Sequence, residues 1–292
     1  MLPLYPEIRP FDSQWLSVGS GHRLYVEQAG TAGALPVVVL HGGPGAGCSE
    51  QLRRFFDPEH YHIILFDQRG AGRSEPHADL TDNTSQHLVA DLERLRQHLA
   101  LDSWVLFGGS WGASLSLLYA QTYPQYCRAL ILRGVFLARQ VDLDWRYSGG
   151  AARFFPEEWA RFIDPVNAAT GADLLTAYAE LLNGDNDLAR VSAAKAWARW
   201  EAMNASLRPN HQALEYLTST HVALSLAHIA NHYFCHQCFI EPNQLLDQAD
   251  RLAGIPGYIV HGRYDMLCPP DQALALAKRW PDAELDLVRE GG

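Results

Sequence analysis

The 292-residue sequence has no apolar run close to the roughly 20 residues that a membrane-spanning helix needs. Its start, M-L-P-L-Y-P, lacks the basic residues and apolar core of a secretory signal peptide. Positive charge is also scarce, because 23 Lys and Arg stand against 33 Asp and Glu, for a net charge of -10. This balance argues against nucleic acid or an anionic membrane as a partner. We therefore expect a cytoplasmic protein.

Cysteines are few, and their spacing is irregular. The five cysteines are odd in number and scattered, which favours free thiols over a disulfide framework. Cys235 and Cys238 form a C-x-x-C that, with His228 and His232, would supply four zinc ligands. No second C-x-x-C or H-x-x-x-H pair completes a usual zinc-finger spacing, and the surrounding pattern is that of an apolar helix. We expect helix packing here and no metal site.

Strand and helix patterns alternate along the chain, as a mostly parallel sheet with helices on both faces requires. Strands are expected at residues 23–27, 37–40, 63–66, 104–107, 129–133, 257–261 and 284–288. A helix should follow the third strand, capped at residues 83–84, with leucines at 88, 92, 95 and 99 as its core stripe.

Strand signals vanish between about residues 139 and 240, where the sequence is Ala-rich, helical and holds four of the 8 tryptophans. We interpret residues 139–240 as a helical cap, inserted between two parts of a core at residues 1–138 and 241–292. Such an insertion lies over the carboxyl ends of the strands, where ligands bind. Some of its aromatic residues should wall a pocket.

The most informative motif is G-G-S-W-G at residues 108–112. It follows the apolar run at 104–107 and precedes a helical pattern that a Tyr-Pro pair ends at 123–124. Strand, tight turn and helix form the context of a nucleophile elbow, in which glycines leave room for a strained turn. Ser110 is therefore the candidate nucleophile.

A second motif, H-G-G-P-G at residues 41–45, follows the strand at 37–40. Acyl transfer builds negative charge on the carbonyl oxygen, and backbone N–H groups must already point at it. The residue after the nucleophile, Trp111, and the glycine-rich loop, through Gly43, are the predicted donors. For His41 we favour packing or hydrogen bonding in the loop over proton transfer. For the glycine-rich loop at residues 67–74 we favour a bracing role.

Together these motifs resemble the proline iminopeptidase (prolyl aminopeptidase) family of the α/β-hydrolase superfamily. The resemblance runs from Y-P-E-I at residues 5–8 to the last residue, and includes N-H-Y-F at 231–234 and H-G-R-Y-D at 261–265. It implies an α/β-hydrolase fold with a helical cap. It also implies release of N-terminal proline from peptides by a serine mechanism, without metal or cofactor.

By the same resemblance Asp265 is the acid that orients the catalytic histidine, in the order Ser, Asp, His that this fold uses. Asp271 and Asp250 are weaker rivals. The family places its histidine directly after the last strand, but all 13 histidines of this sequence lie at or before His261. The sequence stops, apparently by one position, before that residue is due. We expect either a truncated sequence, which the end in mid-motif favours, or an inactive form, and poor activity in both cases.

The family also binds the substrate's amino terminus with carboxylates of the cap. Glu201 matches the first of these, whereas Ala230 stands where the second is expected. Loss of one carboxylate should weaken the selection for a free amine by about 1–3 kcal/mol.

Three functions remain in view: a serine aminopeptidase acting on N-terminal proline, a related esterase or amidase with a relaxed amine requirement, and a non-catalytic binding protein that keeps the cap pocket. The oligomeric state is left open.

Overall fold

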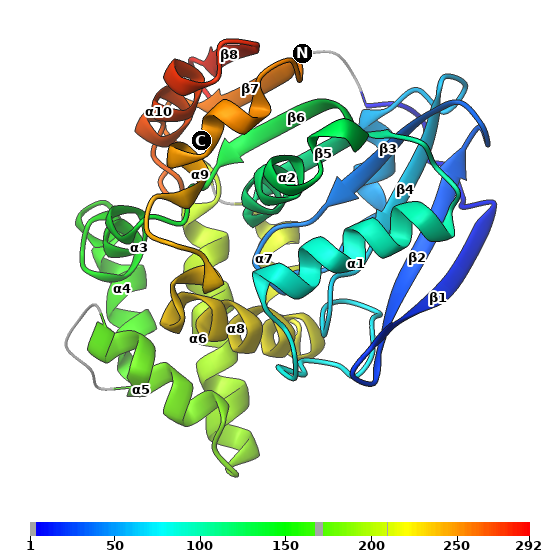
Figure 1. Ribbon diagram of the computed structural model, residues 1–292. Helices are drawn as coiled ribbons and strands as arrows, with labels where there is room; N and C mark the ends of the chain where they lie inside the picture. Colours follow the sequence, from blue (N-terminus) through cyan, green and yellow to red (C-terminus); the bar gives the residue numbers. More distant parts are fainter. Residues whose placement is uncertain (1–3, 167–171, 209) are drawn as a thin grey trace.

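The computed structural model describes residues 4–166, 172–208 and 210–292. One mixed sheet forms the centre of the molecule (Figure 1). Its strands are β1 (Asp12–Gly19), β2 (His22–Gly30), β3 (Leu35–Leu40), β4 (Tyr61–Phe66), β5 (Trp104–Ser110), β6 (Cys127–Val135), β7 (Gly257–Gly262) and β8 (Ala283–Val288).

The strands lie in the order β1-β2-β4-β3-β5-β6-β7-β8. β1 pairs with β2, and β2 with β4, in antiparallel fashion, while every pairing from β4 to β8 is parallel. The parallel part therefore presents the carboxyl ends of six strands at one edge. This is the edge where open α/β sheets bind ligands.

Ten α-helices are present among the described residues. They are α1 (Ser85–His98), α2 (Trp111–Thr122), α3 (Gln140–Tyr147), α4 (Pro156–Ile163), α5 (Ala172–Leu182), α6 (Asp187–Asn204), α7 (His211–Leu217), α8 (Thr220–Cys235), α9 (Gln244–Asp247) and α10 (Asp271–Arg279). None of the helices in the described part of the chain is long and apolar enough to cross a membrane.

Side chains of the central strands alternate between two buried clusters, because successive residues of a strand point to opposite faces of the sheet. In β3, Val38 and Leu40 belong to the larger cluster, whereas Val37 and Val39 belong to the smaller one. The larger cluster also takes in side chains of the helices between β6 and β7. The central strands are thus buried on both faces, as is typical of parallel sheets, whereas β1, β7 and β8 each keep one exposed face.

Every strand expected from the sequence is present, and β1 is an addition. The predicted helix after the third strand is α1, and the Thr84 side chain accepts a hydrogen bond from the His87 amide at its start. Its stripe is buried at Leu88, Leu92 and Leu95. The expected fold class, an α/β fold with a mostly parallel sheet, is confirmed.

The described elements between β6 and β7 are α3 to α8 and short 3₁₀ turns, with no strand among them. In Figure 1 these helices gather on one side of the sheet, below β6 and β7. We call residues 139–240 the cap, and its independence as a domain stays a prediction. It contacts the core near the strand ends, where the Ser225 hydroxyl of α8 donates to the Gly45 carbonyl (3.0 Å).

Candidate active site

The strand β5 ends in a tight turn at Ser110, and α2 begins at the next residue. Ser110 has φ 55° and ψ −122°, a backbone conformation that residues other than glycine rarely adopt. Neighbouring backbone is so close that a Cβ built on Gly112 would lie 2.0 Å from the Leu40 carbonyl oxygen. This strained turn between strand and helix is the geometry of a nucleophile elbow. The catalytic role of Ser110 remains a prediction that this geometry favours.

The loop after β3 packs against the elbow. A Cβ built on Gly42 would be 3.4 Å from the Cβ of Ser110 and 4.0 Å from its Oγ. Gly43 has φ +115°, and its N–H donates no hydrogen bond to the described residues. Trp111 is the first residue of α2, so its N–H has no acceptor within the helix. Both predicted oxyanion donors are therefore free to bind a ligand.

The segment after β4 braces this loop, as the sequence predicted. The Nε2 of His41 accepts a hydrogen bond from the Gln68 amide (3.0 Å), and its Nδ1 lies 2.9 Å from the Gly42 carbonyl oxygen. Asp67 is buried, and its carboxylate accepts from the Cys48 amide (2.7 Å). Burial also lowers the pKa of His41. Because both ring nitrogens of His41 are engaged in the loop, its contacts are those of a structural residue.

Asp265 follows β7, and backbone groups hold its carboxylate. Its Oδ1 accepts from the amides of Leu267 (3.0 Å) and Cys268 (2.8 Å). Burial raises the pKa of this carboxyl, although the hydrogen bond from Cys268 opposes the shift. Asp265 and Ser110 line one cavity of about 370 Å³. Only β6 separates their strands, β7 and β5, in the sheet.

The two rival carboxylates lie elsewhere. Asp250 is exposed in a short 3₁₀ turn. Asp271 is exposed at the start of α10 and pairs with Arg139 (3.2 Å). Asp265 is the one of these three acidic residues that lines the cavity with Ser110.

The backbone at residues 291 and 292 lines the same cavity. The Gly291 carbonyl accepts from the Tyr264 amide (2.8 Å), and the Gly292 carbonyl from the Leu207 amide of the cap (3.2 Å). The approach is close, since a Cβ built on Gly292 would lie 2.6 Å from the Tyr264 carbonyl oxygen. Gly291 and Gly292 therefore form part of the wall of the cavity that holds Ser110 and Asp265.

One histidine, His261, approaches Asp265. Its Nε2 lies 3.7 Å from the Asp265 carboxylate and 2.6 Å from the Cys268 carbonyl oxygen. Its Nδ1 accepts from the Val135 amide (3.1 Å), so the ring proton is on Nε2 and is donated to Cys268. A histidine bonded at both nitrogens inside the core is not placed to take a proton from Ser110.

Glu201, the predicted amine ligand, lies buried in α6 with its carboxylate already bonded. It accepts from Arg146 Nη2 (3.0 Å) and from the Tyr147 hydroxyl (2.8 Å). Arg146 is only 1% exposed, and its Nε and Nη1 find no partner in the described part of the chain. Ala230 is buried in α8 and offers no second carboxylate. A substrate amine at Glu201 would have to share this carboxylate with Arg146.

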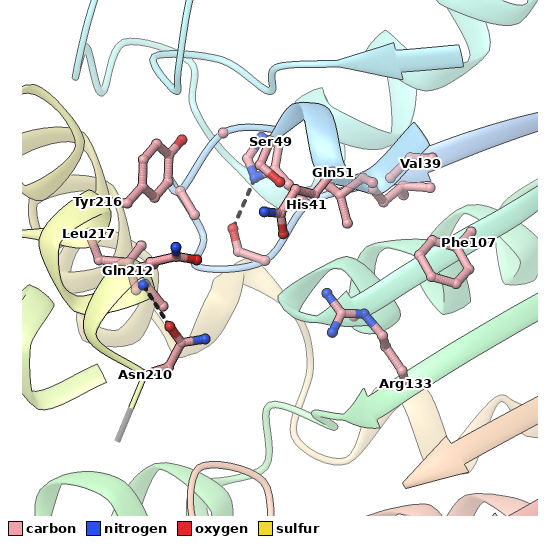
Figure 2. Close-up of a pocket in the computed structure, with 17 residues that line it drawn as sticks. Val39, His41, Ser49, Gln51, Phe107, Arg133, Asn210, Gln212, Tyr216 and Leu217 are labelled. Atoms are coloured by element: carbon pink, nitrogen blue, oxygen red, sulfur yellow. Dashed lines mark hydrogen bonds between the residues drawn. The ribbon is translucent and has the colours of Figure 1, made fainter. Parts of the chain in front are cut away.

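Sequence reasoning missed Arg146, and it also missed Arg133 of β6. Arg133 lines the cavity of Ser110 and a second cavity of about 480 Å³. In Figure 2 its side chain extends toward the open space between β6 and α7. Neither arginine carries a local sequence signal. Arg146 meets a partner 55 positions away, and Arg133 lies in an otherwise ordinary strand.

The four residues considered as zinc ligands make other contacts. His228 lies 2.9 Å from the Ala78 carbonyl oxygen, and His232 lies 3.1 Å from that of Asn83. Cys238 is buried, with its pKa raised by burial. Within residues 4–166, 172–208 and 210–292, no three His, Cys, Asp or Glu side chains are grouped to hold a metal ion.

Known proteins resemble this chain in sequence and in fold. Residues 36–292 match the model of the alpha/beta hydrolase fold family. A proline iminopeptidase of Xylella fastidiosa is 48% identical over 100% of this chain and 94% of its own length. One from Arabidopsis thaliana is 47% identical over 99% of this chain and 77% of its own.

Among solved structures, a proline iminopeptidase-related protein from Thermus thermophilus superposes with a TM-score of 0.61 at 24% identity. That match covers 97% of this chain and 90% of the other, and it speaks for the fold alone. The sequence relatives go further, because they align along essentially the whole chain at nearly half identity. The chain belongs to the proline iminopeptidase family of the α/β-hydrolase superfamily.

Proposed function

We propose that this chain is a cytoplasmic serine aminopeptidase that releases proline from the amino terminus of peptides. The observation that carries the proposal is the strained elbow at Ser110, which shares a cavity with Asp265. The relatives named proline iminopeptidase supply the substrate class.

In the proposed reaction, the Ser110 hydroxyl attacks the carbonyl carbon of the N-terminal proline. The negative charge that develops on the carbonyl oxygen is stabilised by the N–H groups of Gly43 and Trp111. The intermediate then expels the amine of the next residue, which takes up the proton that Ser110 lost. Water hydrolyses the resulting prolyl ester of Ser110 and releases free proline.

The general base is proposed to be a histidine at the position following Gly292. This proposal is supported by Gly291 and Gly292, which line the cavity of Asp265 and whose carbonyls accept hydrogen bonds from Tyr264 and Leu207. Asp265 would accept a hydrogen bond from that histidine and orient it. Neither His41 nor His261 is offered as the base, because each is bonded at both ring nitrogens.

The esterase or amidase with a relaxed amine requirement remains the second candidate. The observation that favours it is the Arg146–Glu201 ion pair (3.0 Å). Arg146 already occupies the carboxylate that the substrate's ammonium group is expected to bind.

The test uses the chain with a histidine appended after Gly292, assayed with proline 2-naphthylamide. We expect clear turnover that falls by about 10³- to 10⁶-fold in Ser110→Ala, since the nucleophile is lost. Ser116→Ala is the matched control, because Ser116 lies on α2 with its hydroxyl bonded to the Gly112 carbonyl (2.7 Å). Turnover that survives Ser110→Ala would refute the proposal. Hydrolysis of N-acetylproline esters without release of proline would favour the second candidate.

A further inference from the structure

Arg133 is a cation without a counter-ion beside the nucleophile. Its side chain is exposed, and in the described part of the chain no carboxylate lies within 4.0 Å of it. It lies directly against the elbow, since a Cβ built on Gly109 would be 2.8 Å from Arg133 Nε and 3.2 Å from its Cζ. Gly109 immediately precedes Ser110, so the guanidinium is a close neighbour of the reacting hydroxyl.

Arg133 also lies where two cavities meet. Gly42, Gly109 and Arg133 line both the cavity of Ser110 and the second cavity of about 480 Å³. This second volume is in the range of small-ligand sites. Besides apolar residues, its lining includes the polar side chains of Gln51 and Gln212 (Figure 2). A ligand that reacts at Ser110 can therefore extend past Arg133 into a neutral, partly polar space.

The charges around Arg133 favour an anion. No Asp or Glu side chain is found among the described residues that line the second cavity. Asp265 lines the other cavity, and its negative charge acts on Arg133 without forming an ion pair. The ring of Phe55 lies 5.9 Å from the guanidinium, near the limit of a useful cation–π contact. A carboxylate is the natural partner of such a cation, because a guanidinium binds it through two parallel hydrogen bonds.

We propose that Arg133 binds the free α-carboxylate of the leaving residue, so that the preferred substrates are prolyl dipeptides. The proposal rests on the proposed function, in which the amine expelled from Ser110 belongs to the residue after proline. One residue spans at most about 3.3–3.6 Å, which suits a guanidinium lying against Gly109 next to Ser110. The side chain of the leaving residue enters the second cavity. A longer peptide places an uncharged amide where the carboxylate belongs.

The first test measures binding without turnover. Ser110→Ala in the full chain is titrated by calorimetry with prolylglycine and with prolylglycinamide, which differ only in the terminal carboxylate. We expect the acid to bind about 10- to 100-fold more tightly, the range of a charge-assisted hydrogen-bonded pair. Adding Arg133→Gln should make the two affinities equal. Arg128→Gln is the matched control, because Arg128 is exposed at the other end of β6 and should leave the preference intact.

The second test measures kcat/KM for the same two compounds in the chain with an appended histidine. Arg133→Gln should lower kcat/KM for prolylglycine by about 10- to 100-fold. The ratio of kcat/KM for prolylglycine to that for prolylglycinamide should fall by a similar factor, whereas Arg128→Gln should leave kcat/KM for both compounds unchanged.

Three results would overturn the proposal. The first is equal affinity for prolylglycine and prolylglycinamide in Ser110→Ala with Arg133 intact, and the second is a preference for prolylglycine that survives Arg133→Gln. The third is no measurable binding of either compound. Failure of the proposed function is distinguishable, because it appears as absent Ser110-dependent turnover of proline 2-naphthylamide, which has no carboxylate.

Discussion

Arg146 and Arg133 both lie beside the candidate active site, but Arg146 forms an ion pair inside the protein and Arg133 forms none with the described residues. Arg146 is enclosed by the rings of Phe136 and Phe234 and held by Glu201. Arg133 is exposed to two cavities, and no carboxylate lies within ion-pair distance in the described chain.

This difference follows from burial. A guanidinium removed from water needs a counter-ion inside the protein, and Glu201 is therefore committed to Arg146 before any substrate arrives. A guanidinium that is exposed in a cavity needs no internal counter-ion and can bind a ligand there. The negative charge of Glu201, the predicted amine ligand, is thus already neutralised, whereas Arg133 beside Gly109 carries a positive charge without an ion pair.

The largest effect is expected from removing the counter-ion of the enclosed arginine. Glu201→Ala leaves Arg146 charged and unpaired in the core, and should lower the free energy of unfolding by about 3–5 kcal/mol. Urea unfolding measures this loss. The double variant Arg146→Met/Glu201→Gln, which removes both charges, should recover most of it. A double variant no more stable than Glu201→Ala would show that packing, and not the lost pairing, causes the effect.

Removing the arginine instead should free Glu201 for the substrate. In the chain with an appended histidine, Arg146→Met should raise the ratio of kcat/KM for proline amide to that for its N-acetyl form. A gain of about 1–3 kcal/mol corresponds to roughly 5- to 150-fold. Adding Glu201→Gln should return the ratio to its starting value. An unchanged ratio in Arg146→Met would place the amine site elsewhere than Glu201.

Asp265 acts electrostatically on both arginines, and its own burial makes stability depend on pH. Because the pKa of its carboxyl is raised, the folded chain keeps this proton to a higher pH than the unfolded chain. The stability that comes from the protonated form is complete below the unfolded pKa and is lost as pH rises through the folded pKa.

We therefore expect Asp265→Asn, whose amide oxygen can still accept from Leu267 and Cys268, to be more stable than the parent chain at pH 7. The advantage should shrink as the pH falls toward 4. Urea unfolding at several pH values measures the trend, and an advantage that grows on acidification would contradict it.

The smallest effect is expected at the exposed arginine. Arg133→Gln should change the free energy of unfolding by less than about 0.5 kcal/mol, because no ion pair is lost. A change this small, compared with the large loss expected for Glu201→Ala, would support the absence of an ion pair at Arg133. A loss above about 2 kcal/mol would mean that Arg133 is a structural residue after all.

The fold was largely predictable because its signals are local. The apolar runs of the central strands and the G-G-S-W-G turn each occupy a few consecutive residues, and the structure places them as expected. The strand β1 was missed because it is a sheet-edge strand in which only Leu16 and Val18 are buried. Such a strand has too few core residues to stand out in the sequence.

The site was only partly predictable, for a different reason. Ser110 is the last residue of β5 and Asp265 follows β7, so the order of elements already places them at one edge of the sheet. The pairing of Arg146 with Glu201 joins residues 55 positions apart on two cap helices, and no sequence pattern specifies it. The lack of an ion pair at Arg133 likewise depends on residues that are close in space but distant in sequence, so no local pattern indicates it.

The central proposal is that Ser110 and Asp265 form a serine-hydrolase site and that its general base is a histidine at the position after Gly292. The most direct measurement is the rate of proline 2-naphthylamide hydrolysis by the 292-residue polypeptide as imidazole is added. Without imidazole the rate should be lower than that of a complete triad by up to about 10⁶-fold. We predict that the rate rises with imidazole concentration and that Ser110→Ala abolishes the rise. Turnover that ignores imidazole and persists in Ser110→Ala would contradict the account.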